Sequence, residues 1–583
     1  MTPAQLYRSR IGVLSLLLLS AAAAIGGYLC GMPVAGPFIF ADESTYFQLA
    51  RNFAAGGGLS GHTQYGPLYP VLTSVFFALP DDVTTYKAIR LFNLVCFASI
   101  SLPIYLLCRQ LTERTVLCLV AASAVLVMPY GAFAHLIWAE PVFFPAIAWV
   151  FYLYFRYSRQ QSAVSGLYAG IAIGVGFLLK PAGIILAVAA GVVELGKLYA
   201  AGRDDRPRLL HGAAGLFLGI GLLTAPWIIR NALLTDGGAL GYPGTAAEMR
   251  SRVAEIGVPA FAGEVALSVF YQASYIVWGT FGLISALIVT TASRWRRLPL
   301  ELRLPVCFLF ITMLGMILLS AVHMTAYRVL GYHFPNGRYY CTFFPFVFLF
   351  YIAAAFGSGG FARKEVWWSV LAAAVSFAII VLATPLLVLA PVSIVNNPEL
   401  SVFMLLFDGK QIIWRGLFEP ALWQRLALGI GIAAAIGLSL LAIRFRVVRP
   451  AVLALLVATI AFMGAESHRY VTAIGATQTA SNRAISFAVA KRKDQQVFFD
   501  PALKGKSINF IMETWSGRSE TKYIDAGLLI SQLNVLVPAK NQVSAVDPSV
   551  SAAKAFYISP RQLNFPVAYA SGWLSVYEIG SSR

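Results

Sequence analysis

Charged side chains are scarce in this chain, and acidic ones are the scarcest. Of its 583 residues, 12% are Asp, Glu, Lys or Arg, 26 of them acidic, while 58% are hydrophobic. Soluble proteins carry roughly a quarter of their residues as charged side chains. The shortage excludes an ordinary soluble protein and predicts a polytopic α-helical membrane protein.

Cysteine and histidine are also few, with six residues of each. The cysteines lie in or beside apolar runs and none falls in the hydrophilic C-terminal part, so no disulfide framework is implied. We find no internal repeat of fixed period and no low-complexity linker. The net charge of +18 does not indicate nucleic acid as a partner, because the basic residues cluster in short loops between apolar runs.

Apolar stretches of about 20 residues, the length that crosses a bilayer, recur along the chain. The first follows Arg8 and Arg10 and has no small-residue cleavage site, so we interpret it as a retained signal anchor. We predict about 13 transmembrane helices, at residues 11–32, 87–107, 115–133, 140–156, 163–179, 181–200, 210–229, 272–292, 304–324, 339–358, 367–390, 425–443 and 450–466.

The charges of the connecting loops predict the orientation of these helices. Seven short loops on one side hold 19 Lys and Arg, which by the positive-inside rule places them in the cytoplasm. The N-terminus is then inside and the C-terminus outside, which requires an odd number of spans. The basic loops are 1–10, 108–114, 156–162, 197–211, 293–303, 361–366 and 444–449, and the outer loops are 33–86, 230–271, 325–338 and 391–424.

Residues 1–466 therefore form a membrane domain, and residues 467–583 differ in character. This last part contains no run of membrane length and is richer in Asp, Ser and Asn. Short apolar runs at 497–499, 555–558 and 574–579 are typical of strands. Residues 481–492 and 526–533 are predicted to be helical. We expect a small extracytoplasmic α/β domain.

An acidic pair, Asp42 and Glu43, follows the first apolar span at the edge of the bilayer. Ionisable groups at such a depth are costly and are functional candidates by default. The alternative is structural, with Asp42 capping the helix that follows and Glu43 stabilising its positive end. Both interpretations can hold together, because a cap also fixes the direction of a carboxylate.

The next residues predict an amphipathic helix lying in the membrane interface. Tyr46, Leu49, Ala50 and Phe53 fall on one face, and three glycines at 56–58 end the helix. The sequence Tyr65-Gly66-Pro67-Leu68-Tyr69-Pro70 then predicts a rigid aromatic turn back toward the membrane.

This order of features resembles the first periplasmic loop of the C-type (GT-C) glycosyltransferases, the superfamily of the protein O-mannosyltransferases and the lipid A aminoarabinose transferases. Further short motifs are similar to that superfamily and follow in the same order. They are Glu140-Pro141, Lys180-Pro181, Pro226-Trp227-Ile228-Ile229-Arg230-Asn231 and Arg338-Tyr339. Thr45 and Gln64 stand where the aminoarabinose transferases carry an Arg and a Lys.

The resemblance implies a transferase with a polyprenyl-phosphate sugar donor and a lipid, glycan or protein acceptor. Membrane lipids are its surroundings, and the site faces the periplasm of a bacterial inner membrane, where it would build cell-envelope glycans. Polyprenyl phosphate is a stable leaving anion, so the reaction needs a base for the acceptor hydroxyl and cations for the phosphate. The resemblance points to Asp42 as the base, with Glu43 beside it and Glu140 as a second acid that lies near the acceptor or orients the base. The structural alternative for Glu140 is an acid at a helix start followed by Pro.

The cations that would hold the donor phosphate are Lys180, Arg230 and Arg338. Each is alternatively a snorkelling anchor at the membrane interface, and Arg230 is alternatively part of a structural helix end. The outer-loop residues expected near the substrate are His62, Tyr65 and Tyr339.

We predict no cofactor; a divalent metal ion is compatible with a transferase, but the sequence does not support one. The histidines His62, His323 and His333 match no ligand spacing, and interfacial histidines are more often structural hydrogen-bond partners. The sugar, the acceptor and the oligomeric state are not encoded in any short motif.

The main rival to a transferase is a transporter or a flippase for lipid-linked sugars. In such proteins, acids and cations within the membrane bind substrate or protons. Transporters often show repeated halves and broken helices near the midplane. Here the candidate charges gather at one surface instead. A non-catalytic assembly scaffold is a third alternative.

Overall fold

The structure of the chain is a computed structural model. It describes residues 3–36, 41–59, 65–234, 243–280, 282–295, 298, 300–327, 337–357, 375, 430, 433–438, 446–477, 479–491, 497–500, 522–523, 555–560, 562–563, 567–571 and 574–579. Outside these residues lie His62, His333, Gln64, the outer loop 391–424, all of the predicted span 367–390 except residue 375, most of the predicted span 425–443 and the predicted helix 526–533.

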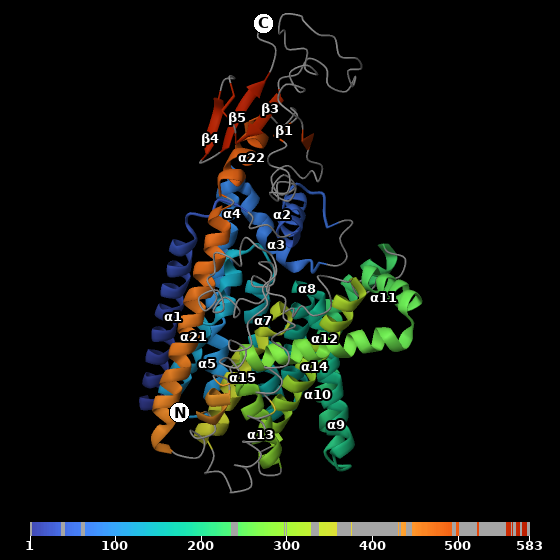
Figure 1. Cartoon of the computed structure of the whole chain (residues 1–583). Helices are drawn as coiled ribbons and strands as arrows, with labels where there is room; N and C mark the ends of the chain where they lie inside the picture. Colours follow the sequence, from blue (N-terminus) through green and yellow to red (C-terminus); the bar gives the residue numbers. More distant parts are fainter. Residues whose placement is uncertain are drawn as a thin grey trace, which may run out of the picture.

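Long apolar helices form a bundle (Figure 1). The helices before the gap that begins at residue 358 are α1 (Pro3–Gly31), α2 (Ala41–Ala54), α3 (Leu68–Ser74), η1 (Val75–Ala78), α4 (Asp82–Ala98), α5 (Ser101–Leu111), α6 (Thr115–Leu126), η2 (Pro129–His135), α7 (Glu140–Gln160), α8 (Ala163–Leu179), η3 (Pro181–Gly183), α9 (Ile184–Ala200), α10 (Arg206–Leu234), α11 (Pro243–Ile256), α12 (Val258–Gly279), α13 (Leu283–Arg294), α14 (Leu300–Tyr327), η5 (Gly337–Tyr339), η6 (Cys341–Phe343) and α15 (Phe344–Gly357). The later helices are η9 (Arg446–Val448), α21 (Arg449–Thr477) and α22 (Thr479–Lys491).

The described residues contain seven helices long and apolar enough to cross a membrane. The number is eight if the bent pair α6 and η2, which meet at 51°, counts as one span. The chain is therefore a multi-pass membrane protein, as predicted. The predicted total of 13 is not reached in this part of the chain, where α8, α13 and the helix over Cys341–Ala353 are apolar but shorter.

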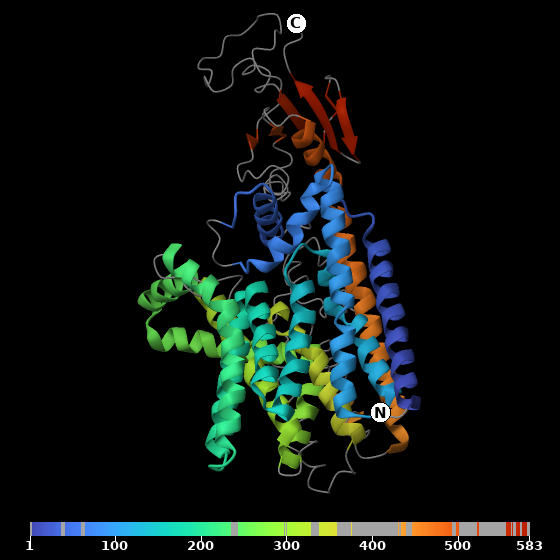
Figure 2. The same ribbon diagram turned by 180° about the vertical axis from the view of Figure 1, so that it is seen from behind.

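One predicted span has the wrong boundaries. The expected helix at 272–292 instead spans the end of α12 and most of α13. The two helices are separated by Thr280, residue 281 and Gly282, and Gly282 has the left-handed φ of 72° that glycine tolerates. The helix α12 begins at Val258, so it takes up part of the predicted outer loop 230–271, and α11 takes up another part. Figures 1 and 2 show α11 and the first part of α12 projecting sideways from the bundle.

Close contact between α8 and α10 relies on glycine. A Cβ atom at Gly170 of α8 would collide with the Leu216 carbonyl of α10, and one at Gly219 of α10 would collide with the Leu167 carbonyl of α8. Small residues let membrane helices approach this closely. The close approach fixes α8, whose last residue precedes Lys180, against its neighbour.

The two ends of the bundle are different. The first residues of α1 and of α21 lie at one end, while α2, α3 and α22 lie at the other (Figures 1 and 2). Beyond α22 is a five-stranded sheet in the order β2-β1-β3-β5-β4, formed by β1 (Val497–Phe499), β2 (Lys522–Tyr523), β3 (Ala555–Ser559), β4 (Val567–Ser571) and β5 (Leu574–Ile579). The strand β1 runs parallel to β2 and β3, and β5 runs antiparallel to β3 and β4. The strands predicted at 497–499, 555–558 and 574–579 correspond to β1, β3 and β5.

Candidate active site

Four of the predicted site residues meet at the end of the bundle that carries α2 and α3. Asp42 lies in the first turn of α2, and Glu140 is the first residue of α7. Lys180 and Arg338 lie at breaks between helices, Lys180 between α8 and η3 and Arg338 within the short helix η5. Pro181 explains the break at Lys180, because the residue before a proline is pushed out of the helical region.

Asp42 and Arg338 form an ion pair across 296 residues of sequence. The distance between Asp42 Oδ2 and Arg338 Nη1 is 2.5 Å, and the Tyr65 hydroxyl donates to Asp42 Oδ1 at 2.9 Å. The side chains of Asp42 and Arg338 keep 27% and 19% of their surface exposed. Both carboxylate oxygens of Asp42 thus accept hydrogen bonds from side chains, and the side chain is still partly exposed to solvent.

The protonation states of this pair follow from its surroundings. Burial alone would raise the pKa of Asp42, but Arg338 and then Tyr65 outweigh burial and hold that pKa below its ordinary value. Burial, followed by the charge of Asp42, raises the pKa of Tyr65, so Tyr65 remains a proton donor. Asp42 is therefore ionised at neutral pH.

Glu140 and Lys180 form a second ion pair beside the first. Lys180 Nζ lies 2.6 Å from Glu140 Oε1, and these side chains are only 9% and 3% exposed. Arg338 Nε lies 4.0 Å from the same glutamate oxygen, so it connects the two pairs. The ring of Tyr339 lies 4.3 Å from Lys180 Nζ. Two carboxylates and two cations from four distant segments are thus in one cluster.

Glu43 is fully buried and binds groups at Tyr86 and Ile137. Its Oε1 atom accepts hydrogen bonds from the Tyr86 hydroxyl at 2.9 Å and from the Ile137 amide at 3.1 Å. Ile137 lies three residues before Glu140, so this contact connects the first turn of α2 to the start of α7. Of the two acids in the pair, Asp42 faces the cations and Glu43 joins two backbone segments.

Arg230 has different partners. Its guanidinium donates to the Leu59 carbonyl at 2.6 Å and to the Asn231 amide oxygen at 3.0 Å, and it lies 4.4 Å from the ring of Trp227. Among the described residues, these contacts involve neither Asp42 nor Glu140. They agree with the structural alternative of an ordered helix end.

Trp138 belongs to the site, although the sequence interpretation gave it no role. Its ring lies 5.0 Å from the Arg338 guanidinium carbon, a cation–π distance. The signal was its position two residues before Glu140. Tyr46 is a similar case, because its ring packs edge-on against Tyr65 at 4.9 Å, and Tyr65 in turn binds Asp42.

Within the part of the chain that the structure describes, no group of three or more His, Cys, Asp or Glu residues is arranged to hold a metal ion. One oxygen of Glu140 is paired with Lys180, and one oxygen of Asp42 is paired with Arg338.

Residues 64–229 match the family model of the dolichyl-phosphate-mannose-protein mannosyltransferases. The resemblance to the C-type glycosyltransferases is thereby confirmed. This family description agrees with the predicted enzyme class, which is a glycosyltransferase that uses a lipid-phosphate sugar donor. The matched residues include Tyr65, Glu140 and Lys180, whereas Asp42 and Arg338 lie outside them.

The chain is also similar to solved structures. ArnT from Cupriavidus metallidurans bound to undecaprenyl phosphate has 14% identity and a TM-score of 0.47, over 96% of this chain and 97% of that chain. The oligosaccharyltransferase AglB from Archaeoglobus fulgidus, with an inhibitory peptide and a dolichol-phosphate, has 11% identity and a TM-score of 0.46, over 87% and 64%. The arabinosyltransferase EmbB from Mycobacterium smegmatis has 14% identity and a TM-score of 0.40, over 82% and 41%. None of the curated proteins compared with the chain matches it.

Proposed function

We propose that the protein transfers a sugar from a polyprenyl-phosphate donor to an acceptor outside the cytoplasm, with Asp42 as the general base. The acceptor is a lipid, a glycan or a protein, and the site faces the periplasm of a bacterial inner membrane. The observation that carries this proposal is the cluster of Asp42, Arg338, Glu140 and Lys180, in which an ionised carboxylate lies beside two cations. The family match over residues 64–229 supports the donor class.

The chemistry needs little more than these groups. Asp42 takes the proton of the acceptor hydroxyl, and the acceptor oxygen then attacks the anomeric carbon of the sugar from the side opposite the phosphate. The bond between that carbon and the phosphate oxygen breaks, its electrons leave with the polyprenyl phosphate, and the configuration is inverted. Arg338 and Lys180 stabilise the departing negative charge.

The contacts of Arg338 suggest how the base becomes available. In the structure, Arg338 holds one oxygen of Asp42 and lies near Glu140. A donor phosphate in the site would compete with Asp42 for this guanidinium, because Arg binds phosphate as well as carboxylate in bidentate fashion. Donor binding would thereby free one oxygen of Asp42 for the acceptor hydroxyl.

The orientation of the bundle supports a site outside the cytoplasm. Asp42 lies in α2, at the end from which the C-terminal sheet extends, and the first residues of α1 lie at the other end (Figures 1 and 2). If the basic loops face the cytoplasm, as the positive-inside rule predicts, α2 faces outward.

Substitution of Asp42 by Asn tests the assignment of the base. Asn keeps the shape but accepts no proton, so we expect transfer from a lipid-linked sugar to fall by about 10²–10⁴-fold, the usual contribution of a general base. The assay measures glycosidic product with the purified, folded protein. Asp204→Asn is the matched control, because Asp204 is exposed on a loop at the other end of the bundle. Undiminished transfer by Asp42→Asn would exclude Asp42 as the base.

The same preparation separates a transferase from a flippase. Reconstituted in sealed vesicles with a labelled lipid-linked sugar and an acceptor, a transferase forms a new glycosidic bond. Movement of the label to the opposite leaflet without such a bond would favour the flippase.

A further inference from the structure

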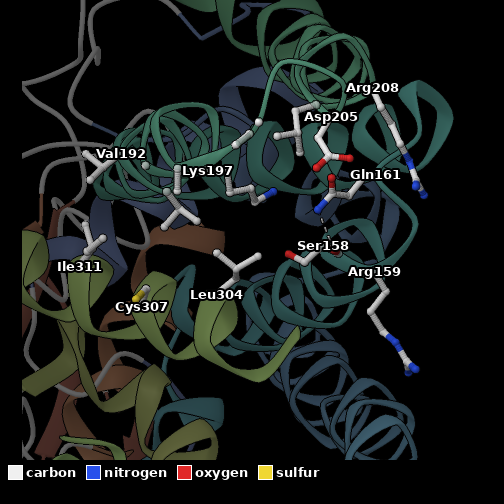
Figure 3. Close-up of a pocket in the computed structure, with 16 residues that line it drawn as sticks. Ser158, Arg159, Gln161, Val192, Lys197, Asp205, Arg208, Leu304, Cys307 and Ile311 are labelled. Carbon is white, nitrogen blue, oxygen red and sulfur yellow. Dashed lines mark hydrogen bonds between the residues drawn. The ribbon is translucent and has the colours of Figure 1, made fainter. Parts of the chain in front are cut away.

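A cavity lies at the end of the bundle opposite Asp42. Its volume is about 680 Å³, and it opens between the last turns of α7 and α9 and the first turns of α10 and α14 (Figure 3). These helix ends border the loops 156–162 and 197–211, which the charge pattern places in the cytoplasm. The cavity shares no residue with the cluster around Asp42 and is independent of the proposed function.

The cavity has a polar and an apolar side. Lys197, Gln161 and Asp205 line one side, and Val192 and Ile311 line the other (Figure 3). A ligand that fills such a space carries a polar group and a hydrocarbon part on the same molecule. In a membrane, lipids have this combination of a polar headgroup and apolar chains.

Contacts with Glu194 and Tyr157 hold the side chain of Lys197 in place. Its ammonium lies 2.6 Å from Glu194 Oε1 and 4.6 Å from the ring centre of Tyr157, and its side chain is only 4% exposed. Tyr154 and Tyr157 both donate to Glu194 at 3.0 Å. Glu194 takes one of the three N–H donors of Lys197, and among the described residues no other acceptor is within hydrogen-bond distance. Lys197 therefore presents donors to the cavity from a fixed position.

The remaining charges of the lining favour an anion. The lining carries three cations, Lys197, Arg159 and Arg208, against Asp205 in the lining and Glu194 paired with Lys197 behind it, which leaves a net positive charge. Both arginines are exposed at the rim, where Arg159 donates to Gln110 and Arg208 donates to the Gln160 carbonyl. Basic pockets between membrane helices on the cytoplasmic side are the usual sites for anionic lipid headgroups.

We propose that this cavity binds an anionic glycerophospholipid of the inner leaflet. The phosphate lies at Lys197, with Arg159 and Arg208 at the rim, and the acyl chains follow Val192 and Ile311. Asp205 accepts a hydrogen bond from a hydroxyl of the headgroup, as phosphatidylglycerol provides. This hydrogen bond lets the Asp205 carboxylate lie near the negatively charged phosphate of the lipid.

A cavity-filling substitution provides the sharpest test. Gly196 lines the cavity, and a Cβ atom added there meets no other atom within 4 Å. Leu at this position would fill the space without a backbone clash. Gly26→Leu is the matched control, because a Cβ at Gly26 on α1 also meets nothing within 4 Å and this residue is not part of the lining.

The full chain is placed in nanodiscs of phosphatidylcholine, with and without a minor fraction of phosphatidylglycerol. We expect phosphatidylglycerol to raise the unfolding temperature and to remain bound in native mass spectrometry. The Gly26→Leu control should keep both effects and Gly196→Leu should lose them. Arg159→Gln and Arg208→Gln should each reduce the preference for phosphatidylglycerol by roughly fivefold, the contribution of one basic residue near anionic lipid.

Three results would overturn the proposal. One is an equal response of the unchanged protein to both lipids, and another is an unaltered preference in Gly196→Leu. The third is equal stabilisation by glycerol 1-phosphate in solution, which would mean a soluble phosphate site. If Gly196→Leu does not fold, the Arg159→Gln and Arg208→Gln proteins decide, since both side chains are exposed and an unchanged preference in both counts against the proposal.

Discussion

At the scale of single residues, Arg338 controls the protonation of Asp42. Burial raises the pKa of Asp42, and Arg338 is the main group that lowers it again. The Arg338→Met substitution removes the positive charge that lowers the pKa of Asp42, whereas burial still raises it. The pKa of Asp42 therefore rises, and a smaller fraction of Asp42 is ionised at a given acidic pH. We expect the acid limb of the pH profile of kcat to move to higher pH, while the unchanged protein keeps its activity down to pH values near the lowered pKa.

Arg230→Met is the control for this shift. Arg230 is a cation of the same membrane end, but its described partners are Leu59 and Asn231. Its removal should leave the position of the acid limb unchanged. If both variants moved the limb equally, the effect would be a general change of surface charge, and the Asp42–Arg338 contact would not be its cause.

The pair of Glu140 and Lys180 predicts strong coupling. Both side chains are almost fully buried, so removing one partner leaves a buried charge with poorer compensation. We expect Glu140→Gln or Lys180→Met alone to cost about 3–5 kcal/mol of stability. The double variant should cost clearly less than the sum of the two. Thermal unfolding of the four proteins in lipid measures this, and additive losses would show that the two side chains do not depend on each other.

At the scale of elements, the turn at residues 65–67 positions Lys180. A Cβ atom at Gly66 would collide with the carbonyl oxygens of Leu178 and Leu179, which immediately precede Lys180. We expect Gly66→Ala to separate the turn from the end of α8, to cost roughly 1–3 kcal/mol and to reduce transfer activity. Gly26→Ala, where the added Cβ meets nothing, should match the unchanged protein in both measurements. Equal activity in the two variants would contradict this role of Gly66.

Elements with strong local signals were predicted from the sequence. The acidic pair and the three glycines bracket α2, which spans Ala41–Ala54, and Gly56 and Gly58 indeed have positive φ. The span at 272–292 was wrong because hydropathy continues through the break, where Gly282 leaves the helical conformation. Hydropathy reports burial in lipid and does not detect such a turn.

Short motifs indicated four residues that lie together in the structure, but they did not indicate the contacts. The motifs identified Asp42, Glu140, Lys180 and Arg338, which the structure brings together. No local pattern indicates that Glu43 binds the Ile137 amide, 94 residues away, or that the Arg230 guanidinium binds a backbone carbonyl. Such contacts depend on how distant helices pack, and a single sequence does not encode that packing in any short motif.

At the scale of the whole molecule, the two ends of the bundle have different chemistry. One end holds an ionised carboxylate among cations, and the other holds a basic cavity between the helices. The helix α21 runs from the end where α1 begins to the end that carries the sheet (Figure 1). The C-terminal sheet and the cluster around Asp42 are therefore on the same side of the molecule.

This asymmetry predicts the result of cysteine labelling in intact cells. In a chain whose six cysteines have been replaced, single cysteines are introduced as Gly57→Cys, Asp204→Cys and Val567→Cys, all at exposed positions. We expect a membrane-impermeant thiol reagent to label positions 57 and 567 in whole cells, and position 204 only after permeabilisation, because the basic loop 197–211 faces the cytoplasm. Labelling of all three positions in denatured protein is the control. If positions 57 and 204 were labelled from the same side, the predicted orientation would be wrong. The charge pattern of the loops would then no longer support the placement of the Asp42 cluster outside the cytoplasm.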